Sequence, residues 1–220
     1  ANSTPEHNRM ASYHGLKEPE NVGYYAVIRF GKDIAYNYHN SIKRIASIIQ
    51  RSHNGQDCAF LPDVQLIEGE DRRQYGYGLL YFPSFEAAKY WYECTNEVRQ
   101  QDWLWSAAIL LVPARGAFDK AMSVVEINDW SDFRDQTAFE NEYLAELNDP
   151  SDGRWNVVAC PDYLQYRLRS SWSPKYLVIN QWPDVEAWRR YRQANGVRVH
   201  HFALTAATGT VAVGVNLNVH

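Results

Sequence analysis

The first strand-like segment of the chain, Tyr24 to Phe30, carries a single charge among aromatic and aliphatic residues. Successive side chains on a strand point to opposite faces, so Arg29 shares one face with Tyr25. Because an arginine is unfavourable against packed helices, we expect this face to line an interior, where the guanidinium can pair with a ligand carboxylate. Residues 121–127 align with this strand 97 positions on and place Glu126 at the position of Arg29. The alternative interpretation is that Arg29 and Glu126 pair with each other across the axis that relates the two strands.

A later strand-like segment, residues 75–82, alternates tyrosine with glycine and leucine. We place the tyrosines of this segment on the interior face, Tyr77 and Tyr81 among them. The opposite phase would turn Gly76 and Gly78 inward, and two residues without side chains would leave room for a ligand. The two phases predict different linings for the same interior.

Eight tryptophans and 15 tyrosines make the chain rich in rings, which bury large areas and carry one polar atom each. A core built from aromatic residues is the simplest explanation. The alternative is a cavity lined for a flat or conjugated ligand. Trp103 and Trp105 precede the fourth expected strand, where they either cap the mouth of such a cavity or fill the joint between the two halves of the chain.

Two histidines could act on a ligand as a general base. His39 lies on the first expected helix, and His200 is one of an adjacent pair. Neighbouring residues on a strand point in opposite directions, so His200 and His201 cannot both bind one metal from a regular strand. A haem ligand is a further role for one histidine, although a loop position is the simpler interpretation of His200. We predict no metal site, because the sequence has no His-Glu-x-x-His motif and no Cys-x-x-Cys pair.

The composition argues against several classes of partner. The net charge is −4 and no basic patch stands out, so we expect no nucleic acid. No stretch of 18 or more apolar residues is present, so we expect no segment that spans a membrane. Residues 1–20 are polar and lack the apolar core of a signal peptide. The three cysteines are an odd number without metal-type spacing, which is typical of reduced thiols and favours a cytoplasmic protein.

The chain repeats itself with an almost constant spacing. An offset of 100 relates Phe82–Ala87 to Trp182–Ala187, and an offset of 99 relates Leu61–Asp63 to Cys160–Asp162. Anchors that recur at one spacing indicate two copies of a single supersecondary unit. We therefore divide the chain into three parts, which are a polar N-terminal arm over 1–22, a first module over 23–116 and a second module over 117–220.

Each module has the pattern of a strand, a helix, two strands, a helix and a strand. The fold class is therefore predicted to be α+β, with two tandem ferredoxin-like βαββαβ modules that form one α+β barrel within a single chain. In the first module we expect strands at 24–30, 59–68, 75–82 and 107–112, a helix over 33–50, and a second helix with Ser84 as its N-cap. In the second module we expect strands at 122–127, 156–160, 163–168, 176–181 and 210–217, a long helix from Ser131 to about 148, and a helix opened by 182–184.

The first module also carries a connected set of short motifs. These are Leu61-Pro62-Asp63, a strand that ends in Glu68-Gly69, and a strand that ends in Phe82-Pro83-Ser84 and leads into a helix with Glu86-Ala87-Ala88 and Trp91-Tyr92. This set resembles a family of small bacterial proteins of unknown function in the dimeric α+β barrel superfamily. The second module keeps only the Pro-x-x-Glu-Ala part of the pattern. In such proteins two four-stranded sheets pair into one barrel, so the resemblance implies that both sheets here come from one chain.

The superfamily named by this resemblance includes haem-degrading monooxygenases, cofactor-free quinol oxygenases, lactone isomerases, dye-type peroxidases and plain binding proteins. The aromatic content is also similar to that of pigment-carrying chromoproteins of mushrooms. We predict a protein, monomeric or homodimeric, that binds a small hydrophobic molecule such as a pigment or polyene without catalysis, and no cofactor other than such a bound organic chromophore. The predicted ligand-binding residues are Tyr25, Arg29, Tyr77, Tyr81, Trp103, Trp105, Glu126 and His200.

The alternative function is catalytic. A cofactor-free oxygenase or isomerase would use His39 or His200 as the base and Arg29 to stabilise an enolate or carboxylate. The two functions differ in one requirement, because only the enzyme needs a base within hydrogen-bond reach of the ligand that Arg29 holds.

Overall fold

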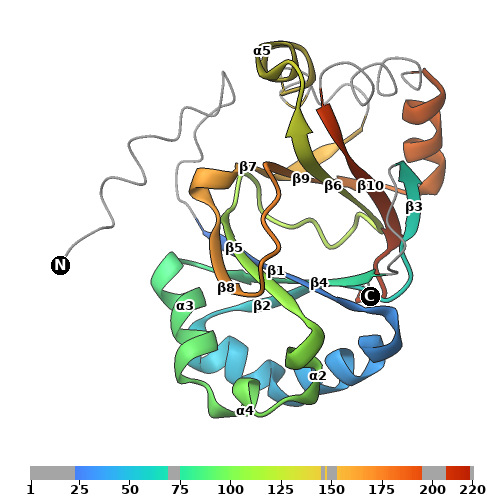
Figure 1. The fold of residues 1–220 in the computed structure, drawn as a ribbon. Coiled ribbons are helices and arrows are strands. Elements are labelled where there is room, and N and C mark those ends of the chain that lie inside the picture. The colour runs from blue at the N-terminus through green and yellow to red at the C-terminus, as the bar shows by residue number, and fades with distance from the viewer. Residues whose placement is uncertain (1–22, 69–74, 145–146, 148–152, 195–206, 219–220) are drawn as a thin grey trace.

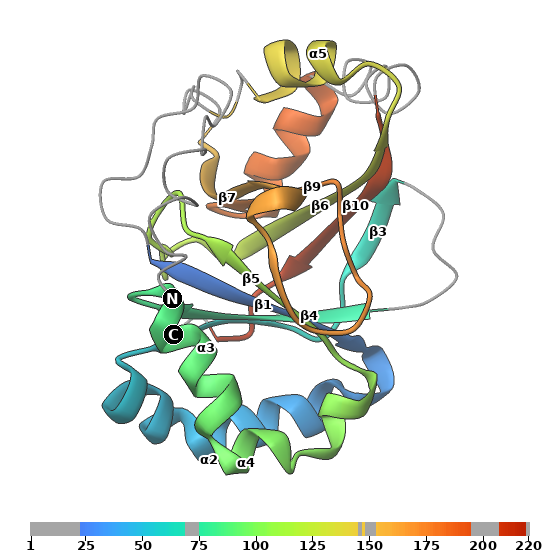
Figure 2. The same cartoon turned by 60° about the vertical axis from the view of Figure 1, so that its left-hand side comes forward.

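The computed structural model describes residues 23–68, 75–144, 147, 153–194 and 207–218. In this part of the chain two five-stranded antiparallel sheets face each other, and helices cover the outer face of each sheet (Figure 1, Figure 2). The predicted arm over 1–22 and His200 lie outside the described residues. No helix in the described ranges has the length and apolar character needed to cross a membrane.

The two sheets differ in which part of the sequence supplies most of their strands. Sheet A has the order β2-β4-β1-β5-β8, and sheet B has the order β3-β10-β6-β9-β7. The strands of sheet A are β1 (Tyr24–Gly31), β2 (Gln56–Leu61), β4 (Tyr75–Phe82), β5 (Ala108–Pro113) and β8 (Tyr166–Arg169). The strands of sheet B are β3 (Gln65–Glu68), β6 (Val124–Phe133), β7 (Trp155–Pro161), β9 (Tyr176–Trp182) and β10 (Ala207–Val215).

Helices α2 (Ala35–His53) and α3 (Phe85–Cys94) pack on sheet A, and a helix over 185–194 packs on sheet B. The shorter helices are α4 (Asn96–Arg99) and α5 (Gln136–Ala138), 3-10 turns at Lys32–Ile34, Asp102–Ser106 and Asp162–Leu164, and a π-helical turn at Phe139–Leu144. The predicted N-cap is confirmed, because the Ser84 hydroxyl accepts a hydrogen bond from the Ala87 N–H at 3.1 Å. At the equivalent position one hundred residues later, the Asp184 carboxylate accepts a hydrogen bond from the Ala187 N–H at 2.7 Å.

The two halves of the chain share one topology. The first half supplies β1, β2, β4 and β5, and the second half supplies β6, β7, β9 and β10. When the four strands of each half are numbered in chain order, they lie side by side in the order 2-3-1-4 in both sheets. This is the strand order of a βαββαβ unit of the ferredoxin-like type. The fold is therefore the predicted one, with two ferredoxin-like modules whose sheets form one α+β barrel in a single chain.

Short strands from each half close the barrel against the other half. β3 follows β2 in the sequence but pairs with β10, and β8 follows β7 but pairs with β5. Beyond these strands, the Arg115 N–H bonds to the Val157 carbonyl at 2.8 Å, and the Leu217 N–H bonds to the Phe60 carbonyl at 3.0 Å. Figure 2 shows the orange segment after β7 reaching sheet A and returning to β9. Each sheet thus takes its fifth strand from the opposite half of the sequence.

The centre of the barrel is filled by side chains from both sheets. Tyr25, Val27 and Leu79 of sheet A are 0% exposed, and so are Val125 and Ile179 of sheet B. A hole wide enough for water beside any of these side chains would leave part of it accessible. The predicted ligand cavity therefore does not extend to these residues.

Two predicted elements differ from the observed ones. The segment 59–68 is predicted as one strand, but it breaks at Pro62, which has no N–H for a ladder, and its two parts join different sheets as β2 and β3. The helix predicted from Ser131 begins at Gln136 instead. Ser131 is still part of β6, and the N-cap is Asp135, whose carboxylate accepts from the Ala138 N–H at 3.0 Å.

Candidate functional site

The pairing of strands corrects the alignment of the two modules. Tyr25 lies opposite Tyr81 in sheet A, and Val125 lies opposite Gln181 in sheet B. Since residues 81 and 181 are related by the offset of 100, residues 25 and 125 are equivalent too, and the predicted offset of 97 for this strand is wrong. The residue equivalent to Arg29 is therefore Asp129. The corrected position differs from the predicted one by three residues, which is an odd number. Glu126 and Asp129 therefore point to opposite faces of the strand.

The corrected alignment also changes the interpretation of Glu126. Its carboxylate lies on the outer face of sheet B and is only 4% exposed. It accepts hydrogen bonds from Asn128 Nδ2 at 3.2 Å, Asn180 Nδ2 at 2.9 Å and Trp188 Nε1 at 3.0 Å, and Trp188 belongs to the helix over 185–194. The prediction that Glu126 lines the interior with Arg29 is wrong, and its observed contacts attach a helix to the sheet.

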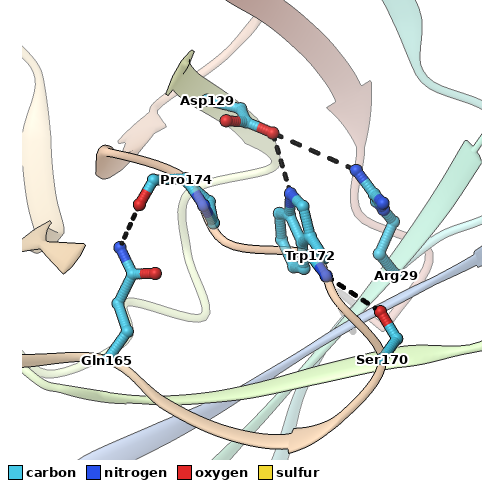
Figure 3. Close-up of polar contacts among 6 residues, drawn as sticks. All are labelled: Arg29, Asp129, Gln165, Ser170, Trp172 and Pro174. Carbon is cyan, nitrogen blue, oxygen red and sulfur yellow. Dashed lines mark hydrogen bonds and ion pairs between the residues drawn. The ribbon is translucent and has the colours of Figure 1, made fainter. Parts of the chain in front are cut away.

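Arg29 lies near one end of the barrel, among aromatic rings and one acid. Its guanidinium carbon lies 4.1 Å from the ring centroid of Tyr75 and 4.4 Å from that of Trp172. Asp129 Oδ2 lies 4.0 Å from Arg29 Nη1, which makes an ion pair but is beyond hydrogen-bond range (Figure 3). The alternative prediction that Arg29 pairs with Glu126 is therefore wrong, because the acid beside Arg29 is Asp129.

The edges of the Arg29 guanidinium are available to a ligand. Among the described residues none accepts a hydrogen bond from its N–H groups, and its side chain is 18% exposed. A guanidinium offers five N–H donors in one plane, which suits the two oxygens of a carboxylate. The rings of Tyr75 and Trp172 hold this group in place by cation–π contact while leaving those donors open.

Trp172 reaches this site from the connection between β8 and β9. Its Nε1 donates a hydrogen bond to Asp129 Oδ2 at 2.8 Å, and its backbone N–H bonds to the Ser170 hydroxyl at 3.0 Å (Figure 3). Gln165 Nε2 donates to the Pro174 carbonyl at 3.0 Å and fastens the far side of the same loop. Trp172 is 7% exposed and belongs to the interior cluster of the barrel.

The tyrosines predicted to face inward do so. Tyr25 and Tyr77 belong to the cluster between the sheets, and Tyr81 packs against it, with the Tyr25 and Tyr81 rings 5.5 Å apart. The Tyr25 hydroxyl donates to the Gly116 carbonyl at 2.8 Å, and burial raises the pKa of this phenol. The opposite phase is excluded, because a Cβ on Gly78 would overlap the Tyr38 hydroxyl of α2 on the outer face.

A groove of about 760 Å³ is lined in part by two tyrosines that also lie beside Arg29 and Trp172. Tyr75 and Tyr77 form one wall, and the Tyr77 ring lies 6.3 Å from that of Trp172. Trp188 and valine side chains of β6, β10 and the helix over 185–194 contribute apolar surface. Lys32 and Arg189 bring positive charge, with Lys32 paired to Asp63 and Arg189 paired to Glu186. The groove and the Arg29 site thus share their tyrosines.

The remaining predicted residues do not join this site. Trp103 is buried on the outer face of sheet A, where its ring meets that of Tyr38 at 5.0 Å, and Trp105 is 84% exposed beside Arg169. Neither caps a cavity mouth. His39 stacks on Phe60 at 4.0 Å, and burial lowers its pKa. Within the described ranges no three His, Cys, Asp or Glu side chains are grouped so as to hold a metal ion.

Sequence reasoning missed Asp129 and Trp172. Asp129 could have been found by applying the offset of 100, which relates Phe82–Ala87 to Trp182–Ala187, to the first strand of each module. Trp172 had no comparable signal, because it stands in a serine-rich turn without periodicity and acts on residues more than 40 positions away.

Comparisons with known proteins assign no family to the chain. No protein-family model matches the chain, and no curated protein sequence matches it. Among solved structures, a haem-binding protein from Thermus thermophilus is 8% identical over 90% of this chain and 92% of its own, with a TM-score of 0.46. An anthrone oxidase-like protein is 12% identical over 90% and 93%, with a TM-score of 0.48. A chlorite dismutase variant from Candidatus Nitrospira defluvii is 7% identical over 93% and 94%, with a TM-score of 0.47. At such identities these likenesses carry no argument about what this chain binds.

Proposed function

We propose that this protein binds a small molecule that has an acidic group and a flat or conjugated apolar body, without catalysing a reaction. The observation that carries the proposal is the Arg29 guanidinium, which contacts two aromatic rings and makes no hydrogen bond to a described residue. A cation positioned in this way, with open donors, is suited to a carboxylate. The ion pair with Asp129 is 4.0 Å long, which is beyond hydrogen-bond range, so Asp129 does not occupy those donors.

The groove beside Tyr75 and Tyr77 supports the second part of the proposal. Its volume of about 760 Å³ is within the range of small-molecule sites, which run from roughly 300 to 1,000 Å³. Tyrosine and tryptophan walls stack well on conjugated systems. The acid would bind at Arg29 and the body would lie along the two tyrosines, so the filled centre of the barrel would stay undisturbed.

The catalytic alternative gains no support from His39. Its ring stacks on Phe60, in the cluster between sheet A and the helices, whereas Arg29 faces the space between the two sheets. The sheet therefore separates this histidine from any ligand that Arg29 would hold. A general base must come within hydrogen-bond reach of the proton that it takes, and His39 does not.

Other features fit a binding protein that acts as a single chain in a reducing compartment. The strands β3 and β8 pair each half with the other, which a monomer can satisfy by itself. Cys58, Cys94 and Cys160 are free thiols. We propose a cytoplasmic monomer whose ligand is a pigment-like or polyene acid.

The test uses cis-parinaric acid, a conjugated polyene acid whose fluorescence rises when it leaves water. We expect saturable binding to the protein, and an affinity about tenfold lower or worse for Arg29→Gln, because a charge-assisted hydrogen bond is lost. Arg44→Gln is the matched control, since Arg44 is an exposed arginine of α2 with one 3.4 Å contact to Gln101. Equal affinities for wild type and Arg29→Gln would refute the assignment of the acid to Arg29.

A further inference from the structure

The contacts of the Trp172 side chain are those that a bound aromatic ligand would make. Its ring lies on the Arg29 guanidinium at 4.4 Å, and its N–H donates to the Asp129 carboxylate at 2.8 Å. Its third neighbour, Tyr77, lines the groove and has its ring 6.3 Å away. A cation under the ring, an acceptor at its edge and an aromatic wall together select a flat ring with an N–H donor.

The segment that delivers Trp172 is suited to moving. It is a turn between β8 and β9, and the residues around the tryptophan, Ser170, Ser171 and Ser173, are exposed serines with short polar side chains. Ser170 has a φ of 73°, in the left-handed region that a serine rarely adopts. The anchors of the turn lie at its far side, where Gln165 Nε2 holds the Pro174 carbonyl and the Lys175 N–H bonds to the Trp130 carbonyl at 2.8 Å. The tip is thus held mainly by the contacts of Trp172 itself.

The groove and the position of the Trp172 ring have two tyrosines in common. Tyr75 lines the groove and also contacts Arg29, and Tyr77 lines the groove and also neighbours Trp172. A ring bound against these two tyrosines would lie next to Arg29 and Trp172. To stack on Arg29 it must displace the indole there, because the same guanidinium already carries the Trp172 ring.

We propose that the position of the Trp172 indole is a ligand subsite that the chain fills with its own side chain, and that a flat heteroaromatic ring with an N–H donor displaces it. The inference rests on the proposed function, because the ring would be part of the ligand bound in the groove. The donor matters since Asp129 accepts the indole N–H, and a ring of the same shape without a donor would leave the carboxylate without that bond. The proposed ligand is therefore narrowed to one whose flat body contains a ring with an N–H donor, such as an indole-like or purine-like ring.

The test records the ¹H–¹⁵N signals of the tryptophan side chains in the full-length protein. The Trp172 signal is assigned by its absence from Trp172→Phe, and the other tryptophans are internal controls. Indole carries the donor, and benzofuran has the same shape with oxygen in place of the N–H. We expect indole to move the Trp172 signal to a saturable end point, and benzofuran to need concentrations about tenfold higher or more.

Two results would overturn the subsite. One is a Trp172 signal that stays in place at indole concentrations that shift other tryptophans, and the other is an equal response to indole and benzofuran. Titration of cis-parinaric acid on the same sample separates the two proposals. If cis-parinaric acid binds through Arg29 while indole leaves the Trp172 signal unchanged, only the subsite is wrong. If indole displaces Trp172 while cis-parinaric acid fails to bind, the subsite stands and the apolar acid is wrong.

Discussion

Arg29 and Asp129 occupy equivalent positions in the two modules, and their side chains meet near one end of the barrel with Nη1 and Oδ2 4.0 Å apart. In a dimer of identical modules the same residue would occur twice at this point, and two like charges about 4 Å apart repel each other. A fused chain avoids this, because each copy of the strand can carry its own residue. The unlike pair is thus a property of the fusion, and it creates one asymmetric site where a symmetric dimer would have two equal halves.

Trp172 should contribute to stability through both its ring and its N–H. Trp172→Phe keeps a ring over Arg29 but removes the donor to Asp129, so we expect a loss of about 1–2 kcal/mol in the free energy of unfolding. Trp172→Ala also leaves a hole, and we expect a loss of about 3 kcal/mol or more. Urea unfolding measures both. Trp105→Ala is the control, because Trp105 is 84% exposed and its removal should change stability by no more than about 0.5 kcal/mol. Equal stabilities of Trp172→Phe and wild type would show that the N–H contributes nothing.

Glu126 should be needed as a carboxylate. It accepts three hydrogen bonds while 4% exposed, and Glu126→Gln would turn an N–H₂ group toward at least one of those donors. We expect a loss of about 2–3 kcal/mol, measured by thermal or urea unfolding. Glu186→Gln, on the exposed face of the same helix as Trp188, removes only a surface pair with Arg189 and should cost under about 0.5 kcal/mol. If Glu126→Gln left the free energy of unfolding unchanged, Trp188 and the asparagines would have to find other hydrogen-bond acceptors.

Gly78 should tolerate no side chain. A Cβ there would overlap both the hydroxyl and the ring of Tyr38, a residue of α2 that is buried between the helix and sheet A. We expect Gly78→Ala to destabilise the protein by about 2–3 kcal/mol, since the helix must shift. Gly214→Ala is the matched change in β10, where the nearest atom is a Val64 methyl at 3.0 Å that can give way, and its cost should be distinctly smaller. Similar costs at the two sites would contradict the packing of α2 on this strand.

Asp57 should make stability depend on pH in an unusual direction. Burial raises the pKa of this carboxyl from 3.8 to about 6, against the lowering effects of Asn218 and Lys43. Between about pH 4 and pH 6 the folded state therefore binds more protons than the unfolded state. The free energy of unfolding accordingly rises as pH falls through 6, because the destabilising charge of the buried carboxylate is lost. Asp57→Asn should be more stable than wild type by roughly 2 kcal/mol at pH 8, with the difference vanishing near pH 4.

The control for this pH effect is Asp102→Asn, at an exposed position. It should leave the difference between pH 4 and pH 8 unchanged. A constant gap between wild type and Asp57→Asn across this range would mean that the carboxyl titrates alike in the folded and unfolded states.

Local patterns in the sequence predicted the topology well, because strands and helices are set by periodicity and by caps such as Ser84. The face of each strand was harder to assign. The tyrosine phase of β4 was right, since glycines on the helix side make room for Tyr38. The assignment of Glu126 was wrong because two apolar strands can be aligned at several shifts, and an odd error reverses the face. The anchor at Pro83 and Pro183 can be aligned in fewer ways, and its offset of 100 also holds for β6.

The contacts that build the site lie beyond such patterns. β3 and β8 are strands of four residues each, and nothing local in them specifies that they pair with the opposite half. Trp172 is a single ring in a turn, and its partner Asp129 is 43 residues away. Such long-range pairs depend on how the two modules close, which is decided by the whole barrel.

The most direct test of the central claim is a cycle of four affinities, with cis-parinaric acid and its methyl ester each titrated into wild type and Arg29→Gln. If the acid group binds Arg29, the ester should lose affinity for wild type but not for the variant, with a coupling of about 1.5–3 kcal/mol between the acid and the guanidinium. A coupling near zero, with acid and ester equally affected by the substitution, would contradict the account and leave Arg29 as only a structural partner of Asp129.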